Sequence, residues 1–301
     1  MTEETGYGVL TDAQWADLAP LIEQCRPPHK TEHKNLRRTI EAIVWRHENG
    51  AKWRSIPPHL GPWWMAAQTF IRWSQHGTWE RLLELAQQGK GITLGMVFLD
   101  GSTIRAHQKA AGAAKKGASS AQRDKREALG RSRGGFSTKA SVIVDGSGRA
   151  VGFALAPGQA NELPMAPVLL RFLTAVALWI VADRGYSSQA LRMLIWGLGS
   201  RPAIPTRRNE ASVACPPWIY TNRNLVERFW SRAKEWRAVA TRYEKTERSF
   251  MGVLCMAATM DWLKAERRIQ GLTGPSTIVR SGCARAAVHA FAKGVGAPLP
   301  A

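Results

Sequence analysis

Two apolar runs, each followed directly by an aspartate, constrain the fold more than any other feature of the chain. The first run, ITLGMVFL (92–99), precedes Asp100, and the second, ALWIVA (177–182), precedes Asp183. Runs this short and this apolar are typical of strands that helices bury on both faces. We expect each strand to stop at its aspartate. Ligands bind at the ends of strands in such sheets, although an aspartate that only caps a turn is the alternative for either one alone.

The segments that follow the first run predict a mixed sheet. STKASVIVDGSG (137–148) and AVGFALAPG (150–158) meet at a DGSG turn, which favours a β-hairpin. Helical and strand patterns then alternate, and SFMGVLCMAATMDWLKAERR (249–268) supplies a last long helix. Hairpin strands followed by alternating helices and strands predict an α/β or α+β domain with helices packed on the sheet.

Residues 10–88 carry helical patterns only. LTDAQWADLAPLI (10–22) opens with a Thr-Asp cap, NLRRTIEAIVWRHENG (35–50) ends on a glycine, and Thr78 caps a further helix. These short helices predict a compact all-α domain in which a helix-turn-helix is possible. We expect its tryptophans to be core residues rather than base-stacking platforms. They are Trp45, Trp53, Trp63, Trp64, Trp73 and Trp79.

The balance of charge favours a polyanionic partner. Lys and Arg number 42 against 23 Asp and Glu, which gives a formal net charge of +19. Residues 105–135 are rich in Ala, Gly, Ser and basic side chains and predict a mobile loop, either a solvated linker or a phosphate-binding arm. No apolar run approaches the roughly 20 residues of a membrane-spanning helix, and no signal peptide is evident. We therefore expect a cytoplasmic protein that binds no membrane. The four cysteines are scattered without a CxxC pair, so we expect reduced thiols.

A third acid lies in a helical pattern crowded with basic residues. In YTNRNLVERFWSRAKEWR (220–237), Tyr220 is followed by Arg223, Glu227 and Lys234. In a helix the last three share one stripe, with the tyrosine about one turn earlier. Exposed ion pairs, each worth about 0.3–0.5 kcal/mol, would explain the charges but not the spacing.

This spacing resembles a known signature. Tyr220-x2-Arg223-x3-Glu227-x6-Lys234 matches the Y-(2)-R-(3)-E-(6)-K pattern of bacterial insertion-sequence transposases of the IS4 and IS5 families, which are DDE transposases with an RNase H-like fold. The segments LDGSTIRAHQKAAG and VADRGYSSQALR around the two aspartates resemble the IS5 side. GAKWRSIPPHLGPWWMAAQTFIRWSQHGTWERLLE resembles the helical N-terminal domain of that family. The resemblance covers residues 10–263.

The resemblance implies a domain organisation. It predicts an α/β catalytic domain, an RNase H-like mixed sheet flanked by helices, at residues 91–268, with the basic loop 105–135 inside it. An N-terminal all-α DNA-binding domain occupies residues 1–90. The tail, residues 269–301, matches no segment of the family, and disorder and a shifted reading frame are the alternatives for it.

The resemblance also implies a chemistry. It makes Asp100, Asp183 and Glu227 the catalytic acids and the ligands of two Mg²⁺ ions, which Mn²⁺ can replace. Three carboxylates suit hard cations, and two such ions roughly 3.5–4 Å apart stabilise both the attacking and the leaving oxygen of a phosphodiester exchange. The first aspartate would bridge the two ions, and no energy cofactor is required.

The implied activity is that of a DNA transposase. Such a protein binds the terminal inverted repeats of its insertion sequence, cleaves there and joins the strand to target DNA, as a homodimer in a synaptic complex at the bacterial nucleoid. Tyr220, Arg223 and Lys234 would contact phosphates near the transposon end. An RNase H-like nuclease that hydrolyses without joining, and an inactivated transposase-derived DNA-binding protein, are the alternatives.

Overall fold

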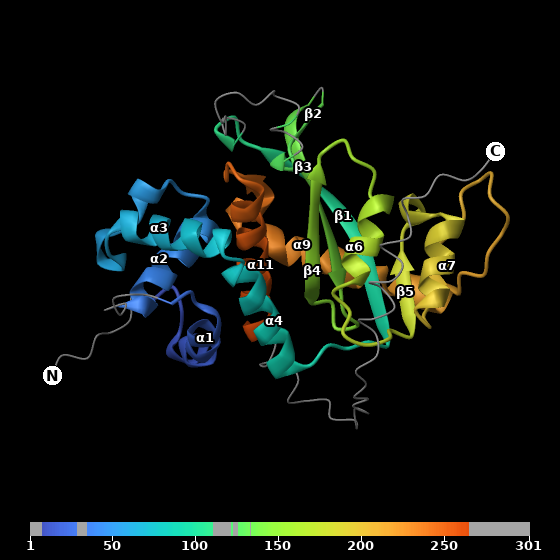
Figure 1. Cartoon of the computed structure of the whole chain (residues 1–301), viewed down its shortest axis with the longest axis horizontal. Helices are drawn as coiled ribbons and strands as arrows, with labels where there is room; N and C mark the ends of the chain where they lie inside the picture. The colour runs from blue at the N-terminus through green and yellow to red at the C-terminus, as the bar shows by residue number, and fades with distance from the viewer. Residues whose placement is uncertain (1–7, 29–34, 111–121, 123–125, 133, 265–301) are drawn as a thin grey trace.

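The fold is a set of N-terminal helices followed by a mixed sheet with helices on both faces (Figure 1). The computed structural model describes residues 8–28, 35–110, 122, 126–132 and 134–264. The predicted tail and the central part of the predicted basic loop lie outside these residues. Within the described residues, no helix is long and apolar enough to cross a membrane.

The N-terminal helices begin and end at residues that the sequence marks. They are α1 (Asp12–Cys25), α2 (Leu36–Asn49), α3 (Trp63–Gln75) and α4 (Thr78–Lys90), with the 3-10 turns η1 (Trp53–Ser55) and η2 (Pro58–Leu60) between α2 and α3. Thr11 caps α1 in a capping box with Gln14, and Gly50 ends α2 at φ 59°. The prediction of a helix from Thr78 is confirmed, but its capping residue is Gly77, which adopts a left-handed backbone.

The tryptophan prediction is confirmed for four of the six residues and wrong for the two at the start of α3. Trp73 and Trp79 are buried, and Trp45 and Trp53 pack partly against the same core. Trp63 and Trp64 are 37% and 49% exposed. Because α3 buries the stripe of Ala66, Phe70 and Trp73, its first turn extends beyond the core.

The seven strands form one mixed sheet. They are β1 (Met96–Ala106), β2 (Gly130–Ser132), β3 (Gly135–Val144), β4 (Ala150–Pro157), β5 (Trp179–Ala182), β6 (Arg201–Ala203) and β7 (Thr241–Arg242). The predicted hairpin is confirmed: β3 is antiparallel to β4 and, on its other side, to β1. The strands β1, β5 and β6 are parallel, while β2 pairs with β3 and β7 with β1. This mixed sheet confirms the α/β arrangement that the sequence pattern predicts and the RNase H-like fold that the resemblance implies.

The first strand does not stop at Asp100, as the sequence suggested. β1 continues to Ala106 because β3 is long enough to pair with it as far as Arg105. The parallel partner β5 does end at this level, where its Ala182 lies opposite Leu99. The predicted loop 105–135 is therefore wrong at both ends, since β1 takes its first two residues and the β2–β3 hairpin its last ones.

Helices cover both faces of the sheet (Figure 1). One face packs against η4 (Leu163–Met165), α6 (Ala166–Leu170) and α7 (Gln189–Gly197). The other packs against α9 (Asn224–Lys234), α10 (Arg237–Ala240) and α11 (Glu247–Lys264). β1 alternates accordingly: Leu99 joins the core below α6 and α7, and Phe98 joins the core below α9 and α11.

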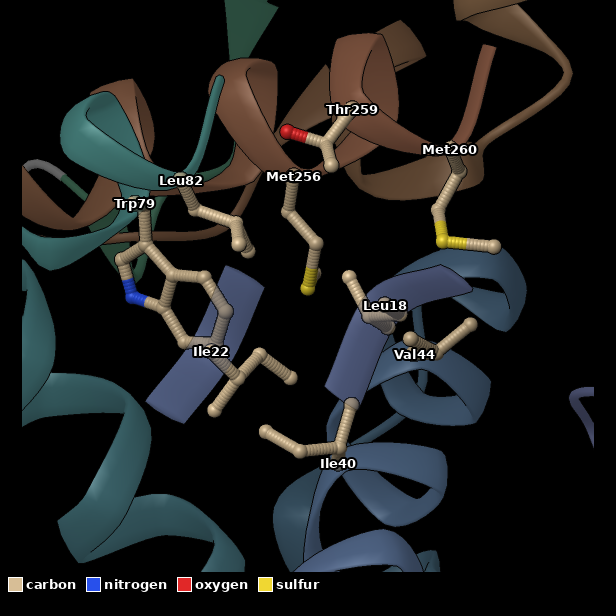
Figure 2. A pocket seen from close by; sticks show the side chains of 9 residues that line it. All are labelled: Leu18, Ile22, Ile40, Val44, Trp79, Leu82, Met256, Thr259 and Met260. Carbon is tan, nitrogen blue, oxygen red and sulfur yellow. The ribbon is translucent and has the colours of Figure 1, made fainter. Parts of the chain in front are cut away.

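The core on the α11 side is continuous with the N-terminal helices. α11 packs on β4 and also on α1, α3 and α4. Figure 2 shows a small cavity between α1, α2, α4 and α11, and every lining residue except Thr259 is apolar. This cavity belongs to the helical core and lies apart from the aspartates at the sheet.

Candidate active site

Asp100 and Asp183 lie side by side on one face of the sheet. The residues before them, Leu99 and Ala182, are register partners in parallel strands, which are about 4.8 Å apart. Those two partners point into the core below α6 and α7. Because side chains alternate along extended backbone, and Asp183 is still extended at φ −77° and ψ 177°, both aspartates point to the α9 side.

The turn-capping role considered for Asp183 is present in the structure. Its Oδ1 accepts a hydrogen bond of 2.8 Å from the backbone N–H of Gly185. This bond caps the 3-10 turn η5 (Arg184–Tyr186). The cap uses one carboxylate oxygen and holds the side chain in a defined orientation. Capping and ligand binding are therefore compatible for this residue.

A helical segment places an arginine over the first aspartate. α8 (Pro217–Tyr220), η6 (Thr221–Arg223) and α9 follow one another, and the backbone stays right-handed helical through both junctions. Arg223 Nη2 donates a hydrogen bond of 2.8 Å to Asp100 Oδ1. Both side chains are largely buried, with 17% and 16% of their surface exposed. The single helix predicted over 220–237 is divided into α8, η6 and α9, and α9 ends at Lys234. Because the backbone remains helical, Arg223, Glu227 and Lys234 still follow one another along one side of this segment.

Burial governs the charge of Asp100. It raises the pKa of this carboxyl group from 3.8 to about 6, and the neighbouring carboxylates of Glu162 and Asp183 act in the same direction. Arg223 opposes them because its positive charge favours the ionised form. The first aspartate is therefore a buried acid whose negative charge depends on a cation beside it.

Glu227 does not form a cluster with Asp100 and Asp183 in the structure. It lies one turn beyond Arg223, in the first turn of α9, and its side chain is exposed. Among the described residues, no group of three or more His, Cys, Asp or Glu side chains could hold a metal ion. Of the other two predicted DNA contacts, Tyr220 packs its ring 5.8 Å from the Arg223 guanidinium, and Lys234 is exposed on α9.

Glu162 is a neighbour of the site that the sequence analysis missed. It lies on the opposite face of β1, where its Cδ would be 2.7 Å from a Cβ atom at Gly101. Lys139 of β3 donates a hydrogen bond of 2.7 Å to its Oε1. No local spacing indicates this contact, because β1, β3 and the segment after β4 each supply one of the three residues.

Comparison with known proteins identifies the family. A family model described as "Putative transposase of IS4/5 family (DUF4096)" matches residues 10–83, and one described as "Transposase DDE domain" matches residues 180–264. A relative from Brucella ovis, "Putative transposase for insertion sequence element IS6501", is 32% identical over 131 residues, which are 43% of this chain and 100% of that protein. The chain belongs to the IS4/5 family of DDE transposases.

Other similarities to this transposase are weaker. The "Uncharacterized protein y4sN" of Sinorhizobium fredii is 28% identical over 104 residues, 35% of this chain and 82% of that protein. A piggyBac transposase synaptic complex with hairpin DNA aligns over 96% of this chain and 73% of that one, with TM-score 0.41 and 10% identity. A pre-cleavage Mos1 transpososome aligns over 88% and 90%, with TM-score 0.25 and 14% identity. Because both TM-scores lie below 0.5, the fold of this transposase is described from its own strand order.

The donor atoms at the site suit the chemistry of this family. A DDE transposase depends on divalent metal ions, and hard divalent cations prefer carboxylate oxygens. Asp100 and Asp183 supply such oxygens on adjacent strands and on the same face. The second family match also includes Asp183 and Glu227, two of the three predicted acids.

Proposed function

We propose that this transposase binds the terminal inverted repeats of its insertion sequence, cleaves the DNA there and joins the freed strand to target DNA. Asp100, Asp183 and Glu227 are the catalytic acids in this proposal, and two Mg²⁺ ions are the cofactors. Residues 1–90 bind the transposon ends, and residues 91–268 carry the catalytic site. The protein works in the bacterial cytoplasm at the nucleoid, as a homodimer that holds both ends.

The placement of two aspartates under one helix carries this proposal. Asp100 and Asp183 are neighbours on adjacent parallel strands, and both face the helical segment that brings Arg223 to the first of them. In a helix, side chains four residues apart have Cβ atoms about 5–6 Å apart, so Glu227 is one turn from a residue that already touches Asp100. The Glu227 side chain is exposed, and in this proposal it turns toward the aspartates.

The residues of the site have separate tasks in the reaction. Divalent ions, when bound, neutralise the charge that develops on the attacking and leaving oxygens of the phosphodiester. Asp183 is oriented by its bond from Gly185, and Asp100 is held ionised by a neighbouring cation. Tyr220 and Lys234 lie on the same helical segment and hold DNA phosphates beside the acids.

A strand-transfer assay tests the proposal. Purified protein, DNA that carries the transposon ends, a plasmid target and Mg²⁺ or Mn²⁺ should give joined products, and Glu227→Gln should abolish them while end binding persists. Glu235→Gln is the matched control, because Glu235 is an exposed glutamate directly after the same helix. Cleavage without joining would favour an RNase H-like nuclease, and binding without cleavage an inactivated DNA-binding protein.

A further inference from the structure

The turn that carries Asp183 is tied to the loop after β6. Within this loop, the Glu210 carboxylate accepts hydrogen bonds from the Ser187 hydroxyl and, at 3.2 Å, from the backbone N–H of Arg207. Ser187 directly follows η5, the 3-10 turn that Asp183 caps. Glu210 therefore joins the segments that leave the carboxyl ends of the parallel strands β5 and β6, where sheets of this class bind ligands.

A buried cation anchors this junction. Arg192 of α7 is 5% exposed, and its Nη2 donates to the Ser187 hydroxyl at 2.9 Å and to the Ile204 carbonyl oxygen at 3.1 Å. Its Nη1 lies 3.8 Å from Glu210 Oε2. A buried arginine thus lies close to the negative charge of Glu210. Side chains from η5's end, α7 and the loop itself hold the loop in place.

The anchored loop brings a second arginine to the Asp183 turn. Arg207 Nη2 donates a hydrogen bond of 3.3 Å to the carbonyl oxygen of Gly185, the residue whose N–H binds Asp183. Arg207 Nε lies 3.9 Å from Glu210, and half of the Arg207 side chain is exposed. A guanidinium has five N–H donors, so most of them are available to a ligand. Arg208, the next residue, is also exposed.

We propose that Arg207 binds a backbone phosphate of the DNA beside Asp183, with Glu210, Ser187 and Arg192 as its positioning residues. A planar guanidinium matches two phosphate oxygens at once, which a lysine does not do. The inference rests on the proposed function, because that function supplies the DNA. It adds a phosphate contact from the β6 side of the acid pair, whereas Tyr220, Arg223 and Lys234 approach from the α9 side.

A binding cycle with neutral phosphates tests the contact. Duplexes of the transposon end, each with one methylphosphonate at a different position around the cleavage site, are titrated in EDTA so that no strand is cut. Arg207→Ala should weaken binding of unmodified DNA about tenfold, as for loss of one charge-assisted hydrogen-bonded contact. At one position, the methylphosphonate should weaken binding by the wild-type protein by a similar factor. The same methylphosphonate should not weaken binding by Arg207→Ala any further. Arg171→Ala, which removes an exposed arginine after α6 on the other face, should bind like wild type.

The positioning residues need a separate readout. Glu210→Gln should reproduce the loss at the same single phosphate, although Glu210 itself carries the wrong charge to touch DNA. Arg207→Lys should bind DNA more tightly than Arg207→Ala but less tightly than wild type, because lysine supplies the positive charge without the paired donors of a guanidinium. Thermal unfolding of each variant is measured alongside, since a weakened loop would lower the Tm without selecting one phosphate.

The results distinguish this inference from the proposed function. Additive losses at every phosphate, or binding by Arg207→Ala within twofold of wild type, would overturn the Arg207 contact whether or not the protein cleaves. A wild-type protein that shows the selective loss but joins no strands would retain the contact and contradict transposition. A wild-type protein that binds no DNA would remove both.

Discussion

Arg223 closes over Asp100, with Nη2 and Oδ1 2.8 Å apart and both side chains mostly buried. The contact links the start of α9 to the middle of β1. A buried carboxylate without a cation is costly, so the arginine stabilises the charged form of the acid until another cation takes its place. The pair therefore connects the ionisation of the site to the position of the helix that carries Glu227.

The first prediction concerns the pH dependence of stability. The pKa of Asp100 is about 6 in the folded protein against 3.8 as its ordinary value, so folding takes up a proton between these pH values. The carboxylate costs stability above about pH 6, and this cost is relieved as pH falls toward 3.8. Relative to Asp100→Asn, wild type should thus gain up to about 2–3 kcal/mol from pH 8 to pH 4. Urea unfolding of both proteins at several pH values measures this difference, and a constant difference would contradict a raised pKa.

The second prediction concerns Arg223 itself. Arg223→Gln removes the charge that lowers the pKa of Asp100, so that pKa should rise further. The pH profile of metal-dependent cleavage should then shift to higher pH, because a protonated carboxyl group is a poor metal ligand. Arg228→Gln, an exposed arginine on the same helix, is the control and should leave the profile in place. An unshifted profile for both variants would show that the ion pair does not control the acid.

The third prediction concerns the close approach of Glu162 to β1. A Cβ atom at Gly101 would lie 2.7 Å from Glu162 Cδ, at the end of a flexible side chain, so Gly101→Ala should displace this carboxylate and weaken its bond with Lys139, at a cost of about 0.5–1 kcal/mol. In a Glu162→Ala background the same substitution should cost nothing further, because the space is vacated. Gly89→Ala is a useful comparison, since nothing lies within 4 Å of its added Cβ and α4 should gain roughly 0.5–1 kcal/mol. An equal cost of Gly101→Ala in both backgrounds would rule out the steric explanation.

The fourth prediction concerns a buried ion pair between the N-terminal helices and the catalytic sheet. Glu244 pairs with Arg46 of α2 and lies 3.6 Å from His47, and all three side chains are buried. Glu244→Gln leaves the arginine without its counter-charge and should cost about 3–5 kcal/mol in urea unfolding. Glu84→Gln breaks an exposed pair with Arg81 and should cost less than about 1 kcal/mol. Similar small losses in both would mean that Arg46 finds another partner.

Local patterns along the chain were enough to predict the elements and the chemical types at the site. Apolar runs, the DGSG turn and the cap residues depend on neighbours within a few positions, and they predicted the hairpin, the buried strands and most helices. The fixed spacing from Tyr220 to Lys234 resembled the signature of a known family, and in a helix such spacing places side chains on a shared face. Asp100 and Asp183 were recognisable as acids that follow buried runs.

Which of these side chains meet depends on how distant segments pack together. The length of β3 carries β1 past Asp100, and the register with β5 sets Asp183 beside it. The contacts of Arg223 with Asp100, of Glu162 with Gly101 and of Glu210 with Ser187 join residues from separate elements. Local periodicity states which face a residue occupies but not which distant segment packs on that face. That pairing follows from how strands align and helices cover the sheet, and it also exposes Trp63 and Trp64 at the edge of the core.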